Sequence, residues 1–369
     1  MQYMDYGRTG LRVSRFGLGC MRYPSDKAES IKMVRYALDN GVNYLDTAYV
    51  YGDSEAVTGK ALKDGYRQKA VLATKCPVWM VNKHSDYERL LDEQLKRLGT
   101  DYADVYLLHS LNHGNWESVK RHDGLTFMDK MVKKGKIRHT AFSFHGTLST
   151  YREIISAYDF EMAQIQLNIL DEYQQAGIEG MEMAAGKGMA VVVMEPLRGG
   201  FLVDKVPDEV KRLVEEYPEK RPLIEWCFRW LYNKPEVTVV LSGTGSVAQL
   251  KQNMEIFDKA ECNILSEADV RLISDIKEAF EGKRSIGCTA CRYCMPCPNN
   301  VEIPEIFRLY NSASLMHTHW VDRELYKQNF LPSGTGADRC TECGLCMTHC
   351  PQGLKIPERL REAHAALMR

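Results

Sequence analysis

Long hydrophobic segments and an excess of charge of one sign are both missing from this sequence. The longest apolar runs, such as Ala190 to Met194, fall far short of the ~20 residues that a membrane-spanning helix needs. The 48 lysine and arginine residues balance the 49 aspartate and glutamate residues, so charge gives no reason to expect nucleic acid or an anionic membrane as a partner. The first residues are polar or charged and lack an apolar signal core, so we expect a cytoplasmic protein.

Cysteine, in contrast, is unusually frequent. Eight of the 12 cysteines lie in two short clusters after residue 287. Disulfides are rare in the cytoplasm, and gaps of two residues between cysteines suit metal ligation better than cross-linking. A length of 369 residues allows about two domains. We therefore expect a first domain over residues 1–282 and a cysteine-bearing second domain over residues 283–369, with a short linker at Glu281-Gly282-Lys283.

Short apolar segments alternate with amphipathic stretches along the first domain. Eight segments have the length and composition of strands buried on both faces: Arg15–Cys20, Val42–Asp46, Ala70–Lys75, Ala103–His109, Ile137–Ser143, Glu161–Asn168, Met189–Glu195 and Val237–Ser242. This alternation predicts a parallel sheet, and eight repeats in this length predict an α/β fold, a (β/α)8 TIM barrel. The alternative is an open doubly wound sheet, which usually has a glycine-rich turn after its first strand. Gly17-Leu18-Gly19 does not follow that pattern.

Helical spacing is clearest in three of the stretches between and after these segments. Helices are expected over Glu29–Asn40 and Tyr87–Leu98, and each is followed by a glycine that suits a helix end. A third helix is expected over Ser266–Phe280, with Ser266 as its N-cap and acidic residues in its first turn.

Three consecutive predicted strands end in ionisable residues, Asp46, Lys75 and His109, and Tyr51 follows the first of them. Each residue alone has an ordinary explanation, as a helix cap, a solvated lysine or a buried histidine. In a TIM barrel, however, the carboxyl ends of the strands converge on one mouth. An ammonium beside a phenol lowers the pKa of the phenol, and a carboxylate keeps the ammonium charged. These four residues are therefore candidates to protonate a carbonyl oxygen, with His109 orienting the carbonyl.

Three motifs over residues 1 to about 280 resemble the aldo-keto reductase superfamily. They are Asn43-Tyr-Leu-Asp-Thr-Ala-Tyr-Val-Tyr-Gly52, Ala73-Thr-Lys75 and Asp104-Val-Tyr-Leu-Leu-His109. The resemblance implies an oxidoreductase that reduces a carbonyl or oxidises an alcohol with NADP(H) or NAD(H). It makes Tyr51 the general acid, tuned by Lys75 and Asp46. Met21, Trp79 and Trp116 follow predicted strands and are candidates for the substrate pocket, although each also suits ordinary packing under loops.

The same resemblance implies where the nicotinamide cofactor lies across the barrel mouth. The implied contacts are Ser143 and Gln164 for the carboxamide, Pro196, Leu197, Gly243 and Thr244 for the pyrophosphate and ribose, and Asn253 for the adenine end. Three positions depart from the commoner family pattern. Phe144 stands in place of an asparagine, and Met194 in place of an aromatic ring. Gln249 stands where an arginine often holds a 2′-phosphate, and an amide lacks the charge for that contact.

The cysteine clusters have the spacing of iron–sulfur ligands. The first is Cys288-x2-Cys291-x2-Cys294-x2-Cys297-Pro298, and the second is Cys340-x2-Cys343-x2-Cys346-x3-Cys350-Pro351. The second matches the bacterial ferredoxin run, in which the last cysteine ligates the other cluster. Two [4Fe-4S] clusters are therefore expected, one on Cys288, Cys291, Cys294 and Cys350, the other on Cys340, Cys343, Cys346 and Cys297. Structural zinc, which commonly uses two separated pairs of ligands, and a disulfide scaffold are the alternatives.

The segment between the two clusters, residues 298–339, is longer than the hairpin of a compact ferredoxin and contains helix-like stretches. The second domain therefore resembles an α-helical ferredoxin, and the whole chain resembles the aldo-keto reductase branch with a C-terminal ferredoxin-type domain. Nicotinamide transfers two electrons together and each cluster transfers one, so a flavin intermediary is conceivable, although no flavin motif is present. The expected partners are a small carbonyl or alcohol substrate and an electron-transfer protein. The alternative function is a redox-sensing or electron-transfer subunit that docks a partner, with clusters fed by an external ferredoxin.

Overall fold

The computed structural model describes residues 1–204, 206–281, 285–288, 292–316 and 319–369. Eight parallel strands close into a barrel in the order β10-β3-β4-β5-β6-β7-β8-β9. Their bounds are β3 (Phe16–Gly19), β4 (Tyr44–Asp46), β5 (Val71–Cys76), β6 (Ala103–Leu111), β7 (Ile137–Phe144), β8 (Met162–Gln166), β9 (Ala190–Met194) and β10 (Val239–Ser242). Every strand lies within or overlaps one predicted segment, so the TIM-barrel prediction is confirmed and the open sheet is excluded.

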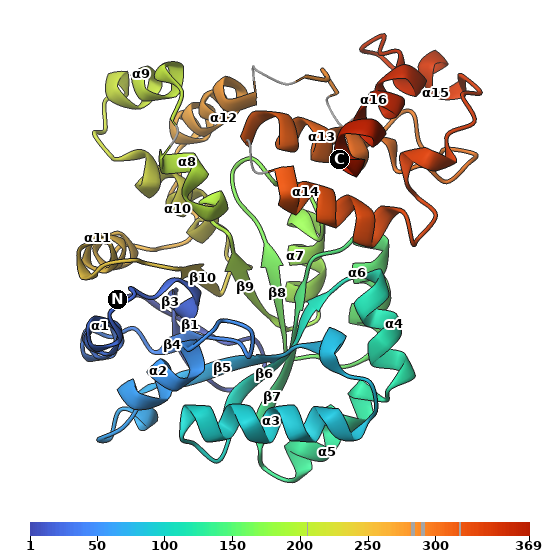
Figure 1. Ribbon diagram of the computed structural model, residues 1–369. Helices are drawn as coiled ribbons and strands as arrows, with labels where there is room; N and C mark the ends of the chain where they lie inside the picture. Colours follow the sequence, from blue (N-terminus) through green and yellow to red (C-terminus); the bar gives the residue numbers. More distant parts are fainter. Residues whose placement is uncertain (205, 282–284, 289–291, 317–318) are drawn as a thin grey trace.

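Helices surround the barrel (Figure 1). They are α1 (Lys27–Asp39), α2 (Ser54–Ala61), α3 (Ser85–Leu98), α4 (His113–Arg121), α5 (Gly124–Lys133), α6 (Leu148–Ala157), α7 (Gly177–Gly186), α8 (Phe201–Asp204), α9 (Asp208–Glu216), α10 (Leu223–Tyr232), α11 (Val247–Phe257) and α12 (Glu267–Glu281). The expected helix ends are confirmed, because Gly99 caps α3 with a φ of 64° and Gly41 follows α1 with a φ of 92°. At the start of α12, Ser266 and Asp269 accept hydrogen bonds from each other's backbone N–H.

A short hairpin that the sequence analysis did not anticipate precedes the barrel. Its strands are β1 (Tyr3–Asp5) and β2 (Arg12–Ser14), which pair antiparallel. Tyr6 next to it is fully buried, and its hydroxyl lies 3.0 Å from that of Tyr44. Gly7 has a φ of +54°, and a Cβ there would lie 2.5 Å from the backbone nitrogen of Ala190. The hairpin therefore presses on the amino end of β9, away from the mouth at the carboxyl ends of the strands.

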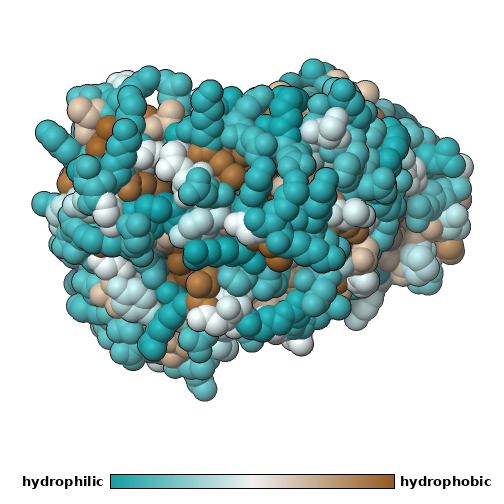
Figure 2. All heavy atoms as spheres, turned by 90° about the horizontal axis from the view of Figure 1, so that it is seen from below, coloured by the Kyte–Doolittle hydropathy of each residue, from teal (hydrophilic) through white to brown (hydrophobic). Residues whose placement is uncertain are grey.

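Two apolar layers build the barrel. One fills its interior and includes Tyr44, Val105, Leu107, Val192 and Val239. The other lies between the strands and the surrounding helices. On the face shown in Figure 2, hydrophilic side chains dominate and hydrophobic ones form small separate groups. In the described part of the chain, no helix has the length and apolar composition that crossing a membrane requires.

The described residues from Ser285 to Arg369, here called the cysteine-bearing unit, form a second helical layer with its own core. Its elements are α13 (Ile303–Met316), α14 (His319–Leu325), the π-helix η5 (Tyr326–Phe330), the 3-10 helix η6 (Ala337–Arg339), α15 (Leu345–Thr348) and α16 (Ile356–Met368). Phe307, Tyr326, Ile356 and Leu360 lie at the centre of this core. The expected linker at Glu281-Gly282-Lys283 lies mostly outside the described residues, so the boundary at 282 stays a prediction.

The cysteine-bearing unit sits on the side of the barrel formed by α6 and α7 (Figure 1). Arg308 of α13 donates a hydrogen bond of 2.7 Å to the backbone oxygen of Tyr173, in the segment before α7. Arg198, in the 3-10 turn η4 (Arg198–Gly200), donates one of 2.5 Å to the hydroxyl of Ser312. Loops of the barrel therefore contact the cysteine-bearing unit directly through hydrogen bonds.

Candidate active site

The barrel brings the four candidate catalytic residues to one mouth. Asp46 ends β4, Lys75 lies near the end of β5, and His109 lies in the carboxyl-terminal half of β6. In the sheet register Asp46 is opposite Ala73 and Lys75 is opposite Leu107, so all three side chains belong to neighbouring strands. Tyr51 lies in the turn after β4, where its N–H bonds to the oxygen of Ala48 at 3.1 Å. The structure thus places together the residues that the sequence placed at three strand ends.

A buried ion pair forms the base of this site. Lys75 Nζ lies 2.6 Å from Asp46 Oδ1 and donates to the backbone oxygen of Thr47 at 2.8 Å. The side chains of Lys75 and Asp46 are 0% and 5% exposed. Burial disfavours the ammonium, but the charge of Asp46 prevails and the pKa of Lys75 is raised. Lys75 therefore stays protonated, and removing either partner would leave an uncompensated charge in the barrel.

Tyr51 lies over this pair. Lys75 Nζ is 4.9 Å from the centroid of the Tyr51 ring. Burial raises the pKa of Tyr51, whereas the charge of Lys75 lowers it, and burial outweighs the lysine. The pKa of Tyr51 is therefore raised rather than lowered as expected from the sequence, because the desolvation of its ring outweighs the nearby ammonium. A phenol with a raised pKa holds its proton at neutral pH, as a proton donor must.

His109 is uncharged at this mouth. Burial lowers its pKa well below the ordinary value, and the charges of Lys75 and His145 lower it further. Its ring centroid lies 5.8 Å from that of Tyr51, nearly perpendicular, and 5.2 Å from that of Trp79. Nδ1 is buried and has no hydrogen-bond partner among the residues described. A neutral imidazole beside the phenol is suited to hydrogen bonding with an uncharged carbonyl rather than to charge stabilisation.

The candidates for the substrate pocket divide into two groups. Met21 and Trp79 are 62% and 45% exposed near the mouth, so both are accessible to a substrate. Trp116 is fully buried, and its indole N–H donates to Glu153 at 2.7 Å. Trp116 is therefore a packing residue of α4, which was the alternative explanation considered for it.

The expected carboxamide contacts fit a nicotinamide ring. Gln164 is 2% exposed, and its Oε1 finds no hydrogen-bond partner in the described chain. A buried amide oxygen without a partner is costly, and a carboxamide N–H would satisfy it. Ser143 lies beside it, one strand away, and accepts a hydrogen bond of 2.7 Å from Ser110 N–H. Phe144, the departure from the family pattern, is fully buried against Tyr151 and makes no polar contact there.

The two loops expected along the pyrophosphate meet through a residue that the sequence analysis missed. Arg22 donates a hydrogen bond of 2.9 Å to the oxygen of Gly199, which follows Pro196 and Leu197. Its side chain also lies 3.6 Å from the place a Cβ would take on Gly243, next to Thr244. Arg22 is exposed, so a positive charge stands between the two loops. No sequence signal marks it, because the contact depends on loops about 180 and 220 residues away.

Two further residues of the expected cofactor site are buried near β10. Thr244 is 1% exposed, and its hydroxyl contacts the sulfur of Met33 at 3.6 Å. Asn253 donates to the hydroxyl of Ser242 at 3.1 Å, and its Oδ1 is buried with no partner within the described ranges. Asn253 therefore offers a free acceptor on α11, where the adenine end is expected.

Arg198 links the loop after β9 to the cysteine-bearing unit. Its φ is +51°, an unusual backbone conformation for a residue with a side chain. Its Nε lies 3.0 Å from Asp171, whose side chain is 1% exposed. The guanidinium also reaches Ser312, which in turn donates to Asp322 at 2.8 Å. Burial raises the pKa of Asp322 to about 6, although the charge of Arg198 opposes the rise.

The described cysteines of the two clusters line two cavities. Cys297, Cys340, Cys343 and Cys346 line one cavity of about 250 Å³. Cys288, Cys294 and Cys350 line a smaller one, and Cys294 also borders the first. Cys291 lies outside the described residues.

Comparison with known proteins gives two matches to protein families. Residues 15–277 match the model of the aldo/keto reductase family, and residues 287–354 match that of a 4Fe-4S dicluster domain. The chain is similar to the NADH-specific methylglyoxal reductase of Escherichia coli, with 25% identity, over 76% of this chain and 100% of that one. It is similar to aldo-keto reductase YhdN of Bacillus subtilis, with 27% identity, over 69% of this chain and 88% of that one. It also resembles the holo structure of aldo-keto reductase AKR11C1 from Bacillus halodurans, with a TM-score of 0.64 and 26% identity, over 76% of this chain and 97% of that one.

Proposed function

Because the chain belongs to the aldo/keto reductase family and carries a 4Fe-4S dicluster domain, we propose that Tyr51 is the general acid of this nicotinamide-dependent oxidoreductase. Its substrate is a small carbonyl compound. The observation that carries the proposal is the buried pair of Lys75 and Asp46 beneath a phenol that keeps its proton. A purely structural barrel would have no use for a buried ion pair at its mouth, where desolvation makes such a pair costly.

The four residues divide the work of the proton transfer. A bound reduced nicotinamide supplies the hydride. Tyr51 gives its hydroxyl proton to the carbonyl oxygen, and the Lys75 ammonium stabilises the phenolate that remains. Asp46 keeps Lys75 charged and fixes its position. Neutral His109 holds the carbonyl by a hydrogen bond, since a charged imidazole would compete with Lys75.

The cofactor site supports NADH over NADPH. Gln249 Oε1 accepts a hydrogen bond of 2.9 Å from Gly245 N–H, so its side-chain oxygen is occupied within the loop after β10. A 2′-phosphate prefers a bidentate guanidinium, which Gln249 does not offer. Gln164 and Ser143 would hold the carboxamide, and Asn253 the adenine end. Arg22 would neutralise the pyrophosphate between the loops at Pro196-Leu197 and Gly243-Thr244.

Two [4Fe-4S] clusters are proposed in the dicluster domain. Cys297, Cys340, Cys343 and Cys346 would hold one of them. Cys288, Cys294 and Cys350, with Cys291, would hold the other.

The surface next to the first of these sets suits an electron-transfer protein partner. Cys343 is exposed, and Tyr293 and Leu345, which line the same cavity, are 68% and 49% exposed. Exposed apolar side chains around a redox centre are typical of a transient docking face.

Anaerobic assays of NADH oxidation with methylglyoxal, the substrate of the similar Escherichia coli reductase by its name, test the catalytic proposal. Tyr51→Phe should lower kcat by about 10²–10⁴-fold, because it removes the proton donor. Tyr49→Phe is the matched control, since Tyr49 lies in the same turn but donates to Glu93 at 2.8 Å, away from Lys75. The control should keep its activity, and both variants should keep the visible absorbance of the clusters. Equal activity of Tyr51→Phe and wild type would refute the assignment.

A further inference from the structure

The strand that carries His109 becomes irregular directly after this residue. In the register of β6 with β7, three steps along β6, from Leu108 to Leu111, lie opposite two steps along β7. Ser110 within this stretch has a φ of +54°, which residues with a side chain rarely adopt. One extra residue in a strand is a β-bulge, and bulges beside active sites commonly change the direction of a side chain.

The bulge lets neighbouring side chains of β6 point to different sides of the barrel. Leu107 belongs to the apolar interior, whereas Leu111 belongs to the layer between the strands and the helices. In a regular strand, residues 107, 109 and 111 would all point to the same face. The extra residue lets His109 follow Leu107 towards the mouth while Leu111 turns outward. The backbone conformation of Ser110 therefore fixes the direction of the His109 side chain.

Two side chains from neighbouring elements hold the backbone of Ser110. Its N–H donates to Ser143 Oγ of β7 at 2.7 Å, and its oxygen accepts from Asn115 Nδ2 of α4, also at 2.7 Å. Asn115 is itself fixed in the first turn of α4, because its N–H donates to Oδ1 of the N-cap residue Asn112 at 2.9 Å. A strained backbone conformation persists only where the surrounding contacts determine it. These two contacts therefore maintain the bulge.

We propose that Asn115 is a positioning residue, which holds Ser110 in the left-handed conformation and so keeps the His109 ring beside Tyr51. The inference rests on the proposed role of His109 in orienting the carbonyl. Displacement of a positioning group by about 1 Å is enough to slow an enzyme strongly. Ser143 also holds the bulge, but it belongs to the expected cofactor site. Asn115 is therefore the residue at which the positioning is tested separately from cofactor binding.

Asn115→Leu removes the donor and keeps a side chain of similar size. Anaerobic assays with NADH and methylglyoxal should show kcat lowered about 10–100-fold, with KM for NADH changed less than about twofold. Adding Ser110→Gly should restore most of kcat, because glycine adopts a positive φ without a supporting hydrogen bond. Ser110→Gly alone is the reference for this comparison. Glycine restores no packing lost at Asn115, so the rescue separates positioning from a merely structural role.

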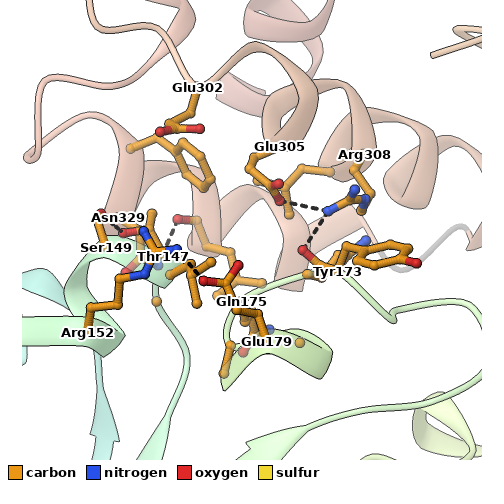
Figure 3. Close-up of a pocket in the computed structure, with 18 of the residues that line it drawn as sticks. Thr147, Ser149, Arg152, Tyr173, Gln175, Glu179, Glu302, Glu305, Arg308 and Asn329 are labelled. Carbon is orange, nitrogen blue, oxygen red and sulfur yellow. Dashed lines mark hydrogen bonds and ion pairs between the residues drawn. The ribbon is translucent and has the colours of Figure 1, made fainter. Parts of the chain in front are cut away.

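Asn329→Leu is the matched control, because it removes the same kind of hydrogen bond far along the chain from His109. The Asn329 amide donates to the backbone oxygen of Leu325 at 3.0 Å. Asn329 lies on η5, at the cavity of about 700 Å³ between the barrel and the cysteine-bearing unit (Figure 3). Asn329→Leu should keep the kcat of the wild type.

Modification of His109 by diethyl pyrocarbonate gives a readout that needs no turnover. His109 is 9% exposed, so the wild type should react slowly at this residue, as measured by mass spectrometry of its peptide. Asn115→Leu should react several-fold faster, and the double variant with Ser110→Gly should react at nearly the wild-type rate. Ser110→Val provides a second test if Asn115→Leu fails to fold. Its β-branched side chain disfavours a positive φ, so His109 should again react faster.

Three outcomes would overturn the assignment. They are unchanged kcat and unchanged modification of His109 in Asn115→Leu, a loss of kcat that Ser110→Gly does not restore, and equal losses of kcat in Asn115→Leu and Asn329→Leu. A wild type that reduces no methylglyoxal would contradict the proposed function instead. The rates of His109 modification would then still decide whether Asn115 positions the ring.

Discussion

Replacement of Lys75 by methionine gives the sharpest prediction for the barrel. The substitution keeps the volume of the side chain but removes the partner of Asp46, whose side chain is 5% exposed. Removing one member of a buried ion pair lowers the free energy of unfolding by about 3–5 kcal/mol, because the remaining charge stays desolvated. The double variant Asp46→Asn/Lys75→Met should regain most of this lost stability, since neither residue then carries a charge. Proton transfer should fail in both variants.

The loss of folding stability in Lys75→Met should grow as the pH rises. Burial raises the pKa of Asp46, and Lys75 opposes that rise in the wild type. Without Lys75, the folded-state pKa of Asp46 lies above its unfolded value of ~3.9. The neutral carboxyl is then tolerated in acid, and stability falls as pH rises from the unfolded pKa through the folded one. The deficit relative to wild type should therefore be larger at pH 8 than at pH 5.

Tryptophan fluorescence during thermal or urea unfolding measures this deficit in the barrel. Four of the five tryptophans, Trp79, Trp116, Trp226 and Trp230, belong to the barrel. A loss of about 3–5 kcal/mol corresponds to about 6–20 °C in melting temperature for a domain of this size. The electrostatic reasoning is refuted if Lys75→Met melts like wild type at pH 8, if its deficit does not change with pH, or if the double variant is no more stable.

Three further predictions concern the cofactor and the mouth. Gln249→Arg should raise the ratio of kcat/KM for NADPH over NADH about tenfold, as it adds a guanidinium for the 2′-phosphate, and an unchanged ratio would contradict this placement. Because His109 is neutral in the folded protein, kcat/KM should show no histidine titration between about pH 6 and pH 8. Ser312→Ala removes the hydrogen bond that holds Arg198, the residue after Pro196-Leu197 in the loop expected along the pyrophosphate, and should raise KM for the nicotinamide a few-fold with kcat unchanged. A change in kcat alone would contradict a role of Ser312 in positioning this loop.

The barrel was predictable because its strands are buried on both faces, and continuous apolar segments such as that ending at Lys75 stand out in sequence. The hairpin of β1 and β2 was not, because strands of three residues carry too little alternation to detect. Among site residues, Asp46, Lys75 and His109 were predictable from their place at strand ends. The raised pKa of Tyr51 was not, because desolvation depends on the packing around the ring.

Features that depend on contacts between distant segments could not be predicted from the sequence. Arg22 belongs to the site only because the loops at Gly199 and Gly243 approach it. The cavity lined by Gln174 and Asn329 likewise combines residues of the barrel and of the cysteine-bearing unit. Spacing along the chain carries no signal for either. The assignment of the cysteines to two ligand sets stays a prediction, made from spacing that is local in the sequence.

The contacts of Arg198 constrain recombination of this barrel with other C-terminal modules during evolution. Its backbone belongs to the loop after β9, but its guanidinium ends on a hydroxyl more than a hundred residues later in the chain. A barrel recombined with a foreign C-terminal module would keep the arginine and lose its second anchor, while Asp171 would still hold the first. Successful recombinants should therefore carry a hydroxyl at the position of Ser312 or change both sides together. The barrel and the C-terminal module would then be inherited together.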